Sequence, residues 1–354
     1  MKTAIFLGAG ASAADGAPVQ GQLFRAYFES LRLRHHFRHA SDKDLVTFFY
    51  LMFNIDLDDD DLGAVIFPTF EEVLGILDLA VARDESFREF DLVNMAGNSG
   101  RINAIRLYLV ILMAKVLKDA LPATGPTIHD TLVSNLSAVS LLDKVAFFTT
   151  NYDLLLDNAL INKIGSSGGA PINYAIPFFE PPDWTVAAAS AINVYKIHGS
   201  LNWMYCSACN TIKYTPLEKG IVALYDSPEH CTCTKCEAVF QPLIVPPTFF
   251  KNMSNVFLTA IWRAAEQELR SIDHLVFCGY SFPDADLHVK YLLKRIQTSA
   301  RHLQRVTVIN HHTGKTSEQE AAEKNRFQRF LGPVVNYTAA SITDFAANPS
   351  AFIL

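Results

Sequence analysis

Short, strongly apolar segments recur along this chain, and stretches with helical periodicity separate them. They are rich in β-branched and aromatic residues and occupy residues 3–7, 144–150, 192–197, 274–278 and 305–309. Continuous apolar runs of this length are typical of strands buried on both faces of a parallel sheet. Because helical segments such as 153–162, 253–270 and 284–299 alternate with them, the sequence predicts an α/β fold, a doubly wound parallel sheet with one helical and one cysteine-bearing insertion.

The helical insertion is expected over residues 22–140. Its pattern includes a helix at 22–37, an apolar stripe of 3.6-residue spacing from Phe70 to Leu77, and a long helix at 101–121. The acidic run 58–61 is expected to be a solvated loop. We treat the 354 residues as a single domain, 1–354, carrying this insertion and a small module at 200–245. The many phenylalanines of the insertion form either its core or a surface for assembly.

The first strand runs into Gly8-Ala9-Gly10-Ala11-Ser12-Ala13, which fits the loose pattern G-x-G-x-x-A before a helix. In that pattern the glycines let the backbone approach a pyrophosphate. A tight turn without a ligand is the alternative. A dehydrogenase would need an acidic residue about 20 positions later, after a second strand, whereas Glu29 lies in the helical pattern. The segment also imitates a secretory signal, but its apolar core is short and contains two glycines.

Five of the six cysteines fall between Cys206 and Cys236. The pairs Cys206-x2-Cys209 and Cys233-x2-Cys236 are separated by the 23 residues 210–232, a pattern typical of a structural zinc site with four thiolate ligands. Cys231 is an alternative to Cys233 or Cys236, and His230 is a weaker candidate. Since the cysteines cluster instead of forming a spread disulfide framework, we expect a reducing, cytoplasmic location.

The charge and apolar patterns exclude two classes of partner. A formal net charge of −6 gives no general positive field, so we expect no direct binding of nucleic acid. The longest apolar run, 107–114, is shorter than the roughly 18–20 residues of a membrane-spanning helix, so we expect no membrane segment.

A series of short motifs occurs in one order along the chain. They are residues 8–12 (Gly-Ala-Gly-Ala-Ser), 16–18 (Gly-Ala-Pro), 149–153 (Thr-Thr-Asn-Tyr-Asp), 196–200 (Lys-Ile-His-Gly-Ser), the two cysteine pairs, 278–281 (Cys-Gly-Tyr-Ser) and 308–310 (Val-Ile-Asn). This order resembles the sirtuin superfamily. Residues 198–203 and 245–249 resemble its prokaryotic sirtuin-like branch.

The resemblance implies a Rossmann-type domain with a zinc module and a helical module, in which NAD is a substrate cleaved at its nicotinamide–ribose bond. The residues that it implies for NAD binding are Gly8, Ala9, Gly10, Ser12, Pro18, Asn151, Asp153, Gly279, Ser281 and Asn310. Three residues would carry the chemistry: Asn151 would orient a water, Asp153 would hold the nicotinamide carboxamide, and His198 would be the general base at the ribose.

The residue types suit that chemistry. Cleavage builds positive charge on the ribose, so polar groups placed in advance stabilise the transition state. A histidine with a pKa near ~6.5 accepts a hydroxyl proton at neutral pH. A helix cap is the alternative role for Asn151 and Asp153, and it is the favoured role for Asp284 and Asp286.

Two departures from sirtuin deacylases bear on the acceptor. Where those enzymes have Gly-Ile-Pro-Asp-Phe-Arg, residues 16–21 read Gly-Ala-Pro-Val-Gln-Gly, and residues 246–251 replace the peptide-clamping Phe-Gly-Glu. We therefore expect an NAD glycohydrolase that releases nicotinamide and ADP-ribose. The alternatives are an NAD-dependent deacylase or ADP-ribosyltransferase, and an NAD-binding regulatory subunit. The resemblance further implies antiphage defence by NAD depletion, a homo-oligomer, and an operon-encoded partner such as a helicase-type ATPase or an Argonaute.

Overall fold

The structure is a computed structural model that describes residues 2–33, 40–58, 61–92, 100–121, 125–164, 172–179, 191–215, 231–245, 255–284, 286–298, 303–311 and 314–354. The chain forms two compact units. The first contains Met1–Ala17, Leu121–Val245 and Asn252–Leu354, and the second contains Pro18–Ala120 and Pro246–Lys251. The second unit thus takes in most of the expected insertion 22–140, whereas residues 121–140 belong to the first unit.

A seven-stranded parallel sheet forms the centre of the first unit, so the predicted α/β fold is confirmed. Its strands are β1 (Thr3–Leu7), β2 (Val145–Thr149), β3 (Ile172–Asn173), β4 (Ile192–Lys196), β8 (His274–Cys278), β9 (Arg305–Ile309) and β10 (Val335–Thr338). The order across the sheet is β10-β9-β8-β1-β2-β4-β3, with every neighbouring pair parallel. All five predicted strands are present, and β3 and β10 are added at the two edges.

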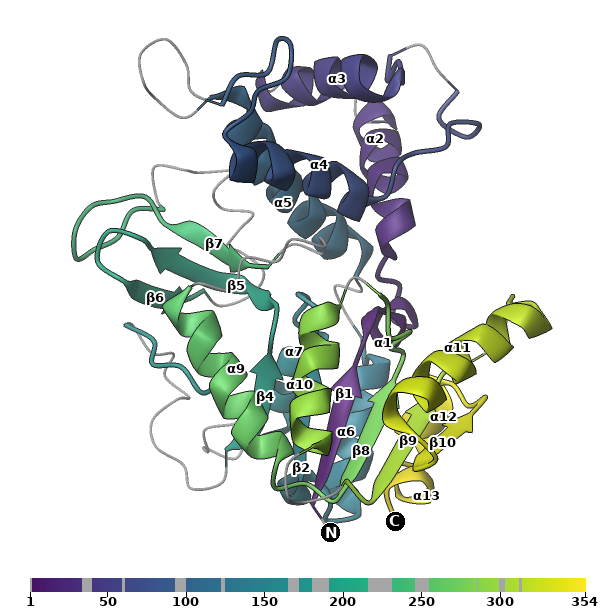
Figure 1. Ribbon diagram of the computed structural model, residues 1–354. Helices are drawn as coiled ribbons and strands as arrows, with labels where there is room; N and C mark the ends of the chain where they lie inside the picture. Colours follow the sequence, from purple (N-terminus) through teal and green to yellow (C-terminus); the bar gives the residue numbers. More distant parts are fainter. Residues whose placement is uncertain are drawn as a thin grey trace. The chain divides into compact units, whose positions relative to one another are not determined.

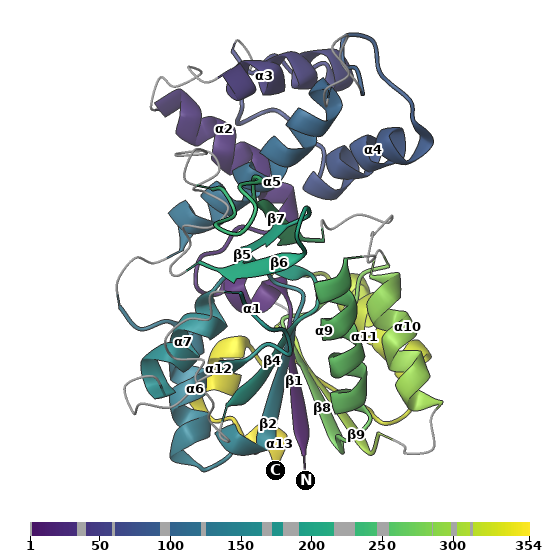
Figure 2. The ribbon, with the colours of Figure 1, turned by 90° about the vertical axis from the view of Figure 1, so that its left-hand side faces the viewer.

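Helices cover both faces of this sheet, as its apolar strands require. Figure 2 shows α6 (Ile128–Ala138), α7 (Leu155–Ile164) and α12 (Ile342–Ala347) on one face, and α9 (Val256–Leu269), α10 (Leu287–Gln297) and α11 (Ser317–Leu331) on the other. Capping boxes at Thr127, Thr316 and Ser341 fix where α6, α11 and α12 begin. Two short helices complete this unit, α1 (Ala9–Ala13) and α13 (Ser350–Ile353).

The direction of the winding changes between β1 and β8, which lie side by side at the centre of the sheet (Figure 1). From β1 the chain adds β2 and β4 on one side, and from β8 it adds β9 and β10 on the other. In open parallel sheets, ligands bind outside the carboxyl ends of the strands at such a switch point. Any small-molecule site is therefore expected where Leu7 and Cys278 end their strands.

A small antiparallel sheet in the order β6-β5-β7 follows β4 within the first unit. Its strands are β5 (Gly199–Cys206), β6 (Thr211–Tyr214) and β7 (Gln241–Ile244), and β5 begins one residue before the range 200–245 expected for the cysteine-bearing module. Trp203 of β5 is fully buried and packs edge-on against Tyr174, with ring centroids 5.2 Å apart. This contact joins the small sheet to the segment that follows β3.

The second unit is helical, with α2 (Leu23–Leu33), α3 (Ala40–Phe53), α4 (Phe70–Arg83) and α5 (Arg101–Ala120) after a short 3-10 turn, η1 (Gln20–Gln22). Six of the phenylalanines that the structure describes in this unit are fully buried. Those exposed by no more than 1% are Phe24, Phe28, Phe48, Phe49, Phe70 and Phe90. These rings form the unit's own core, which confirms the core interpretation for them. Glu29 lies in α2, as its helical pattern predicted, and Asp58 and Asp61 are exposed.

No helix within the described ranges has the length and apolar character needed to span a membrane.

Candidate active site at the carboxyl edge of the sheet

The predicted site residues follow the carboxyl ends of five parallel strands. Gly8, Ala9 and Gly10 follow β1, with Ser12 in α1; Asn151 and Asp153 follow β2; His198 follows β4; Gly279 and Ser281 follow β8; and Asn310 follows β9. Because the strands are parallel and adjacent, their ends meet at one edge of the sheet. The fold therefore gathers these residues, far apart in sequence, along that edge. Pro18 belongs to the second unit.

Three polar side chains form a hydrogen-bonded cluster at the switch point. The Ser12 hydroxyl donates to Asp153 Oδ2 (2.7 Å), and Asn151 Nδ2 donates to Ser12 Oγ (2.9 Å) and to the carbonyl of Gly8 (2.8 Å). Ser12 and Asp153 are 2% and 7% exposed, whereas Asn151 is partly exposed. Since both amide hydrogens of Asn151 point to the glycine turn, its carbonyl oxygen is the atom left to accept a hydrogen bond from a water or a ligand.

The Asp153 carboxylate makes the helix contact that was the alternative to ligand binding, and it also binds Ser12. Its Oδ1 accepts a hydrogen bond from Leu155 N at the start of α7 (3.1 Å), while Oδ2 faces Ser12. The carboxylate thus binds the first N–H of α7 with one oxygen and Ser12 with the other. Thr149, the last residue of β2, connects the end of β1 to the segment that carries Asn151. Its hydroxyl donates to the carbonyl of Leu7 (2.9 Å) and accepts from Asn151 N (2.9 Å).

His198 lies at the junction between the parallel sheet and the small antiparallel sheet, and it is buried, with 3% of its surface exposed. The imidazole stacks on Tyr152 with ring centroids 6.4 Å apart. Val245 fixes both residues, because its N–H donates to the His198 carbonyl (2.8 Å) and its carbonyl accepts from Tyr152 Oη (2.6 Å). The residue after His198 must be glycine, because Gly199 has φ +87 and a Cβ there would lie 2.0 Å from Leu243 O.

The glycine turn packs closely against the end of β8. Gly8 N donates to Cys278 O (3.0 Å) and Gly10 N to Gly279 O (2.8 Å). A Cβ on Gly8 would lie 2.6 Å from Gly279 O, and Gly279 itself has φ +64. The glycines are therefore required by the turn's own packing, whatever ligand it also approaches. Ala9 and Ser281 are exposed beside this contact.

The side chain of Asn310 is held by the buried carboxylate of Glu323. Its Nδ2 donates to Glu323 Oε1 (2.5 Å) and to the carbonyl of Tyr280 (2.9 Å). Burial alone would raise the pKa of Glu323, but hydrogen bonds from Lys315, Tyr337 and Asn310 hold it below its usual value. The carboxylate is thus kept ionised, and it fixes the orientation of the Asn310 amide.

The capping role expected for Asp286 is wrong. Asp286 stands at the N-cap position of α10, but its side chain does not cap the helix. Its Oδ2 instead accepts from Tyr280 Oη (2.7 Å), because the buried phenol needs an acceptor. Asp284 pairs with Lys290 at 2.6 Å.

Four cysteines of the small sheet meet as the sequence predicted. Cys206, Cys209, Cys233 and Cys236 have their sulfur atoms all within 4.8 Å of one another, with Cys206–Cys236 at 3.4 Å and Cys209–Cys233 at 3.6 Å. Zinc–sulfur bonds of about 2.3 Å in a tetrahedron place sulfur atoms roughly 3.8 Å apart, so the group fits a zinc ion. Cys231 is not part of this group, and His230 lies outside the described residues. A zinc ion bound by all four cysteines would have no open coordination position, which is the arrangement of structural zinc sites.

Two buried pairs of polar side chains near the site were missed by the sequence reasoning. Asp15, at the end of the glycine turn, accepts from Ile128 N (2.8 Å) and contacts His129 Nδ1 (2.7 Å) at the start of α6. Lys196 of β4 pairs with Asp157 of α7 at 2.9 Å. A lysine within a predicted buried strand was the available signal for the second pair, whereas nothing local indicated the first.

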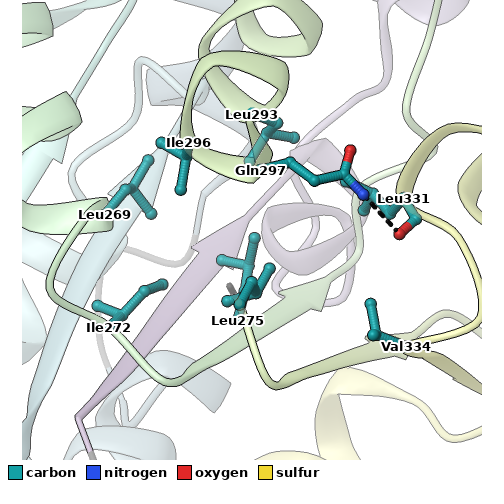
Figure 3. Close-up of a pocket in the computed structure, with 9 residues that line it drawn as sticks. Leu269, Ile272, Leu275, Leu293, Ile296, Gln297, Leu331 and Val334 are labelled. Atoms are coloured by element: carbon teal, nitrogen blue, oxygen red, sulfur yellow. Dashed lines mark hydrogen bonds between the residues drawn. The ribbon is translucent and has the colours of Figure 1, made fainter. Parts of the chain in front are cut away.

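A cavity of about 190 Å³ lies elsewhere, near the amino ends of the strands (Figure 3). Its lining is aliphatic except for Gln297, whose amide donates to Leu331 O (3.0 Å). Such a lining offers no groups for phosphate or ribose, so this cavity is not the predicted site.

Comparisons with known proteins give one family. The SIR2-like domain family matches residues 145–330 of the chain. No curated protein sequence matches it. Solved structures similar to the chain include "Sir2 bound to acetylated peptide" (15% identity, covering 98% of this chain and 90% of that one, TM-score 0.42) and "Sir2-p53 peptide-NAD+" (16% identity, the same coverage, TM-score 0.41).

Proposed function

The chain belongs to the SIR2-like domain family, and from this premise we propose that it is an NAD glycohydrolase, which cleaves the nicotinamide–ribose bond with water to give nicotinamide and ADP-ribose. The observation that carries the proposal is the cluster of Ser12, Asn151 and Asp153 beside the glycine turn. It stands at the switch point, where open parallel sheets bind their ligands.

Each residue of the cluster has a part in this reaction. Asn151 accepts a hydrogen bond from the attacking water through its Oδ1, since its N–H groups are held by Gly8 and Ser12. Asp153, oriented by Ser12, holds the nicotinamide carboxamide. Groups fixed in this way need no reorganisation as positive charge develops on the ribose.

His198 follows the neighbouring strand, because β4 pairs with β2 through Thr149 and Lys196. We assign it the removal of a proton from a ribose hydroxyl, for which a neutral imidazole is the suitable base near pH 7. The other end of NAD would lie along β1, β8 and β9, with Ala9 and Gly10 at the pyrophosphate, Gly279 and Ser281 at the phosphates, and Asn310 at the adenosine ribose.

Water is the proposed acceptor because the chain lacks features that sirtuin deacylases use to hold a peptide. Residues 16–21 have neither the Asp nor the Arg of the deacylase motif. The second departure, at 246–251, lies outside the described residues. The four-cysteine group would hold zinc as a structural element, with no part in the chemical step.

Nicotinamide release from NAD by the purified protein tests this function, with and without an acetyl-lysine peptide. We expect release that does not depend on the peptide and that is lost in His198→Ala. His288→Ala, which removes a partly buried histidine of the same unit, is the control and should remain active. Release that requires the peptide would instead establish a deacylase. A fully active His198→Ala protein would overturn the assignment of the base.

The sequence resemblance also supports a biological role, NAD depletion in antiphage defence by an oligomer or with an operon-encoded partner. Cellular NAD measured after phage infection tests it. We expect NAD to fall in cells that carry the wild type and to stay constant in cells that carry His198→Ala. An equal fall in both would exclude this role.

A further inference from the structure

Lys196 is a charged residue in the interior of the first unit. It ends β4, and only 1% of its side chain is exposed. Its ammonium pairs with Asp157 of α7 at 2.9 Å, and Asp157 is 2% exposed. Desolvating two such ions typically costs several kcal/mol each, so a pair of this kind adds little to stability and is often replaceable by apolar residues. Stability alone therefore gives little reason for a lysine here.

The hydrogen bonds of the pair indicate what the lysine does. Lys196 Nζ donates to Asp157 Oδ2 and also to the main-chain carbonyl of Asp153, at 2.5 Å. The other oxygen of Asp157 accepts from Tyr174 Oη. Burial and the neighbouring Asp157 carboxylate raise the pKa of Tyr174, so the phenol stays protonated and donates this bond.

This ammonium connects the two segments that carry the proposed chemistry. Lys196 stands two residues before His198 on one strand end, and Asp153 stands on the neighbouring strand end. Asp153 is consequently held on three sides: Ser12 and Leu155 N bind its carboxylate, and Lys196 binds its carbonyl. The carboxylate bonds fix the rotamer of the Asp153 side chain, and the lysine bond ties the Asp153 main chain to the end of β4.

We infer that Lys196 is a positioning residue, which sets the place of the Asp153 side chain relative to His198 through its bond to the Asp153 carbonyl. This inference rests on the proposed function, because it concerns how that site is assembled. The dinucleotide's phosphates and adenosine would be held by the ends of β1, β8 and β9, which Lys196 does not touch. Loss of the lysine should therefore lower kcat while leaving KM and the NAD dissociation constant almost unchanged.

The test variant removes both charges together. Lys196→Met alone leaves the Asp157 carboxylate buried without its counter-ion, which is strongly destabilising. Lys196→Met/Asp157→Asn leaves neither charge of this pair, and the side-chain carbonyl at position 157 can still accept from Tyr174. The matched control is Arg106→Met/Asp78→Asn, which removes the ion pair between α5 and α4 in the second unit.

Nicotinamide release gives kcat and KM, calorimetric titration gives NAD affinity, and urea unfolding checks the fold. We expect kcat of the test variant to fall by about 100-fold, the loss typical of a misplacement near 1 Å, with NAD affinity retained. The control should keep wild-type kcat. Placed on an Asp153→Asn background, the same double substitution should cause little further loss, because a residue that acts through Asp153 is not additive with it.

Two results would overturn the inference. One is an active, folded test variant with wild-type kcat, which would leave the proposed function standing. The other is full additivity with Asp153→Asn, the result expected for a role independent of Asp153. A wild-type protein that releases no nicotinamide would overturn the proposed function and this inference with it.

Discussion

Replacing Gly8 by alanine separates two explanations of the glycine turn. If the glycine serves only to let a pyrophosphate approach, Gly8→Ala should weaken NAD binding and leave the free protein's stability unchanged. The structure predicts otherwise, because a Cβ at this position would lie 2.6 Å from Gly279 O and 2.6 Å from Tyr280 Cα. Both are main-chain atoms, so no flexible side chain can move aside.

The expected size of the effect follows from the backbone conformation. Gly8 has φ −104, which alanine adopts without strain, so the whole loss comes from the steric contact. Overpacking of this kind costs about 1–3 kcal/mol. We expect the free energy of unfolding to fall by about that amount in the absence of NAD. Gly75→Ala is the control: it lies in α4 with nothing within 4 Å of the added Cβ, and it should raise stability by about 0.5–1 kcal/mol.

Urea unfolding followed by tryptophan fluorescence selectively measures the loss of stability caused by Gly8→Ala. The second unit's sequence contains no tryptophan, whereas Trp203 and Trp262 belong to the first unit, so the signal reports the unit that contains Gly8. Circular dichroism follows Gly75→Ala, since α4 lies in the other unit. Unchanged unfolding of Gly8→Ala, with only NAD affinity reduced, would refute the packing explanation.

The remaining predictions concern the site, the cysteines and pH. Asn151→Ala should abolish nicotinamide release while the unfolding curve stays within ~1 kcal/mol of wild type, because this amide is partly exposed; loss of folding would show a structural role instead. Cys233→Ser should lose the zinc measured by elemental analysis, whereas Cys231→Ser should keep it; the reverse would make Cys231 the ligand. Burial, then the charge of Arg305, lowers the pKa of His274 to about 4. Because the unfolded chain takes up this proton near pH 6.5, unfolding free energy should fall as pH drops from about 6.5 to about 4. His274→Gln should remove that component, and an unchanged pH profile would contradict the assignment.

Strand positions and the cysteine group were predictable from the sequence because both are local patterns. A buried strand shows as a continuous apolar run, and residues 274–278 form such a run with the bounds observed for β8. Each C-x2-C pair places two thiol groups close together in the sequence, so only the approach of one pair to the other depends on the fold. The capping choice for Asp286 failed because the competing donor, Tyr280, is fixed by packing.

The sequence by itself therefore determined the class of fold, the strands that carry the site and the order of its motifs, since each depends on spacing along the chain. Only the tertiary structure decided which groups touch. The bond from Lys196 to the Asp153 carbonyl, the closeness of Gly8 to Gly279 and the pair of Asp15 with His129 join residues 43 to 271 positions apart. Such contacts are set by sheet order and by the packing of helices on the sheet, and neither leaves a periodic signal in the sequence.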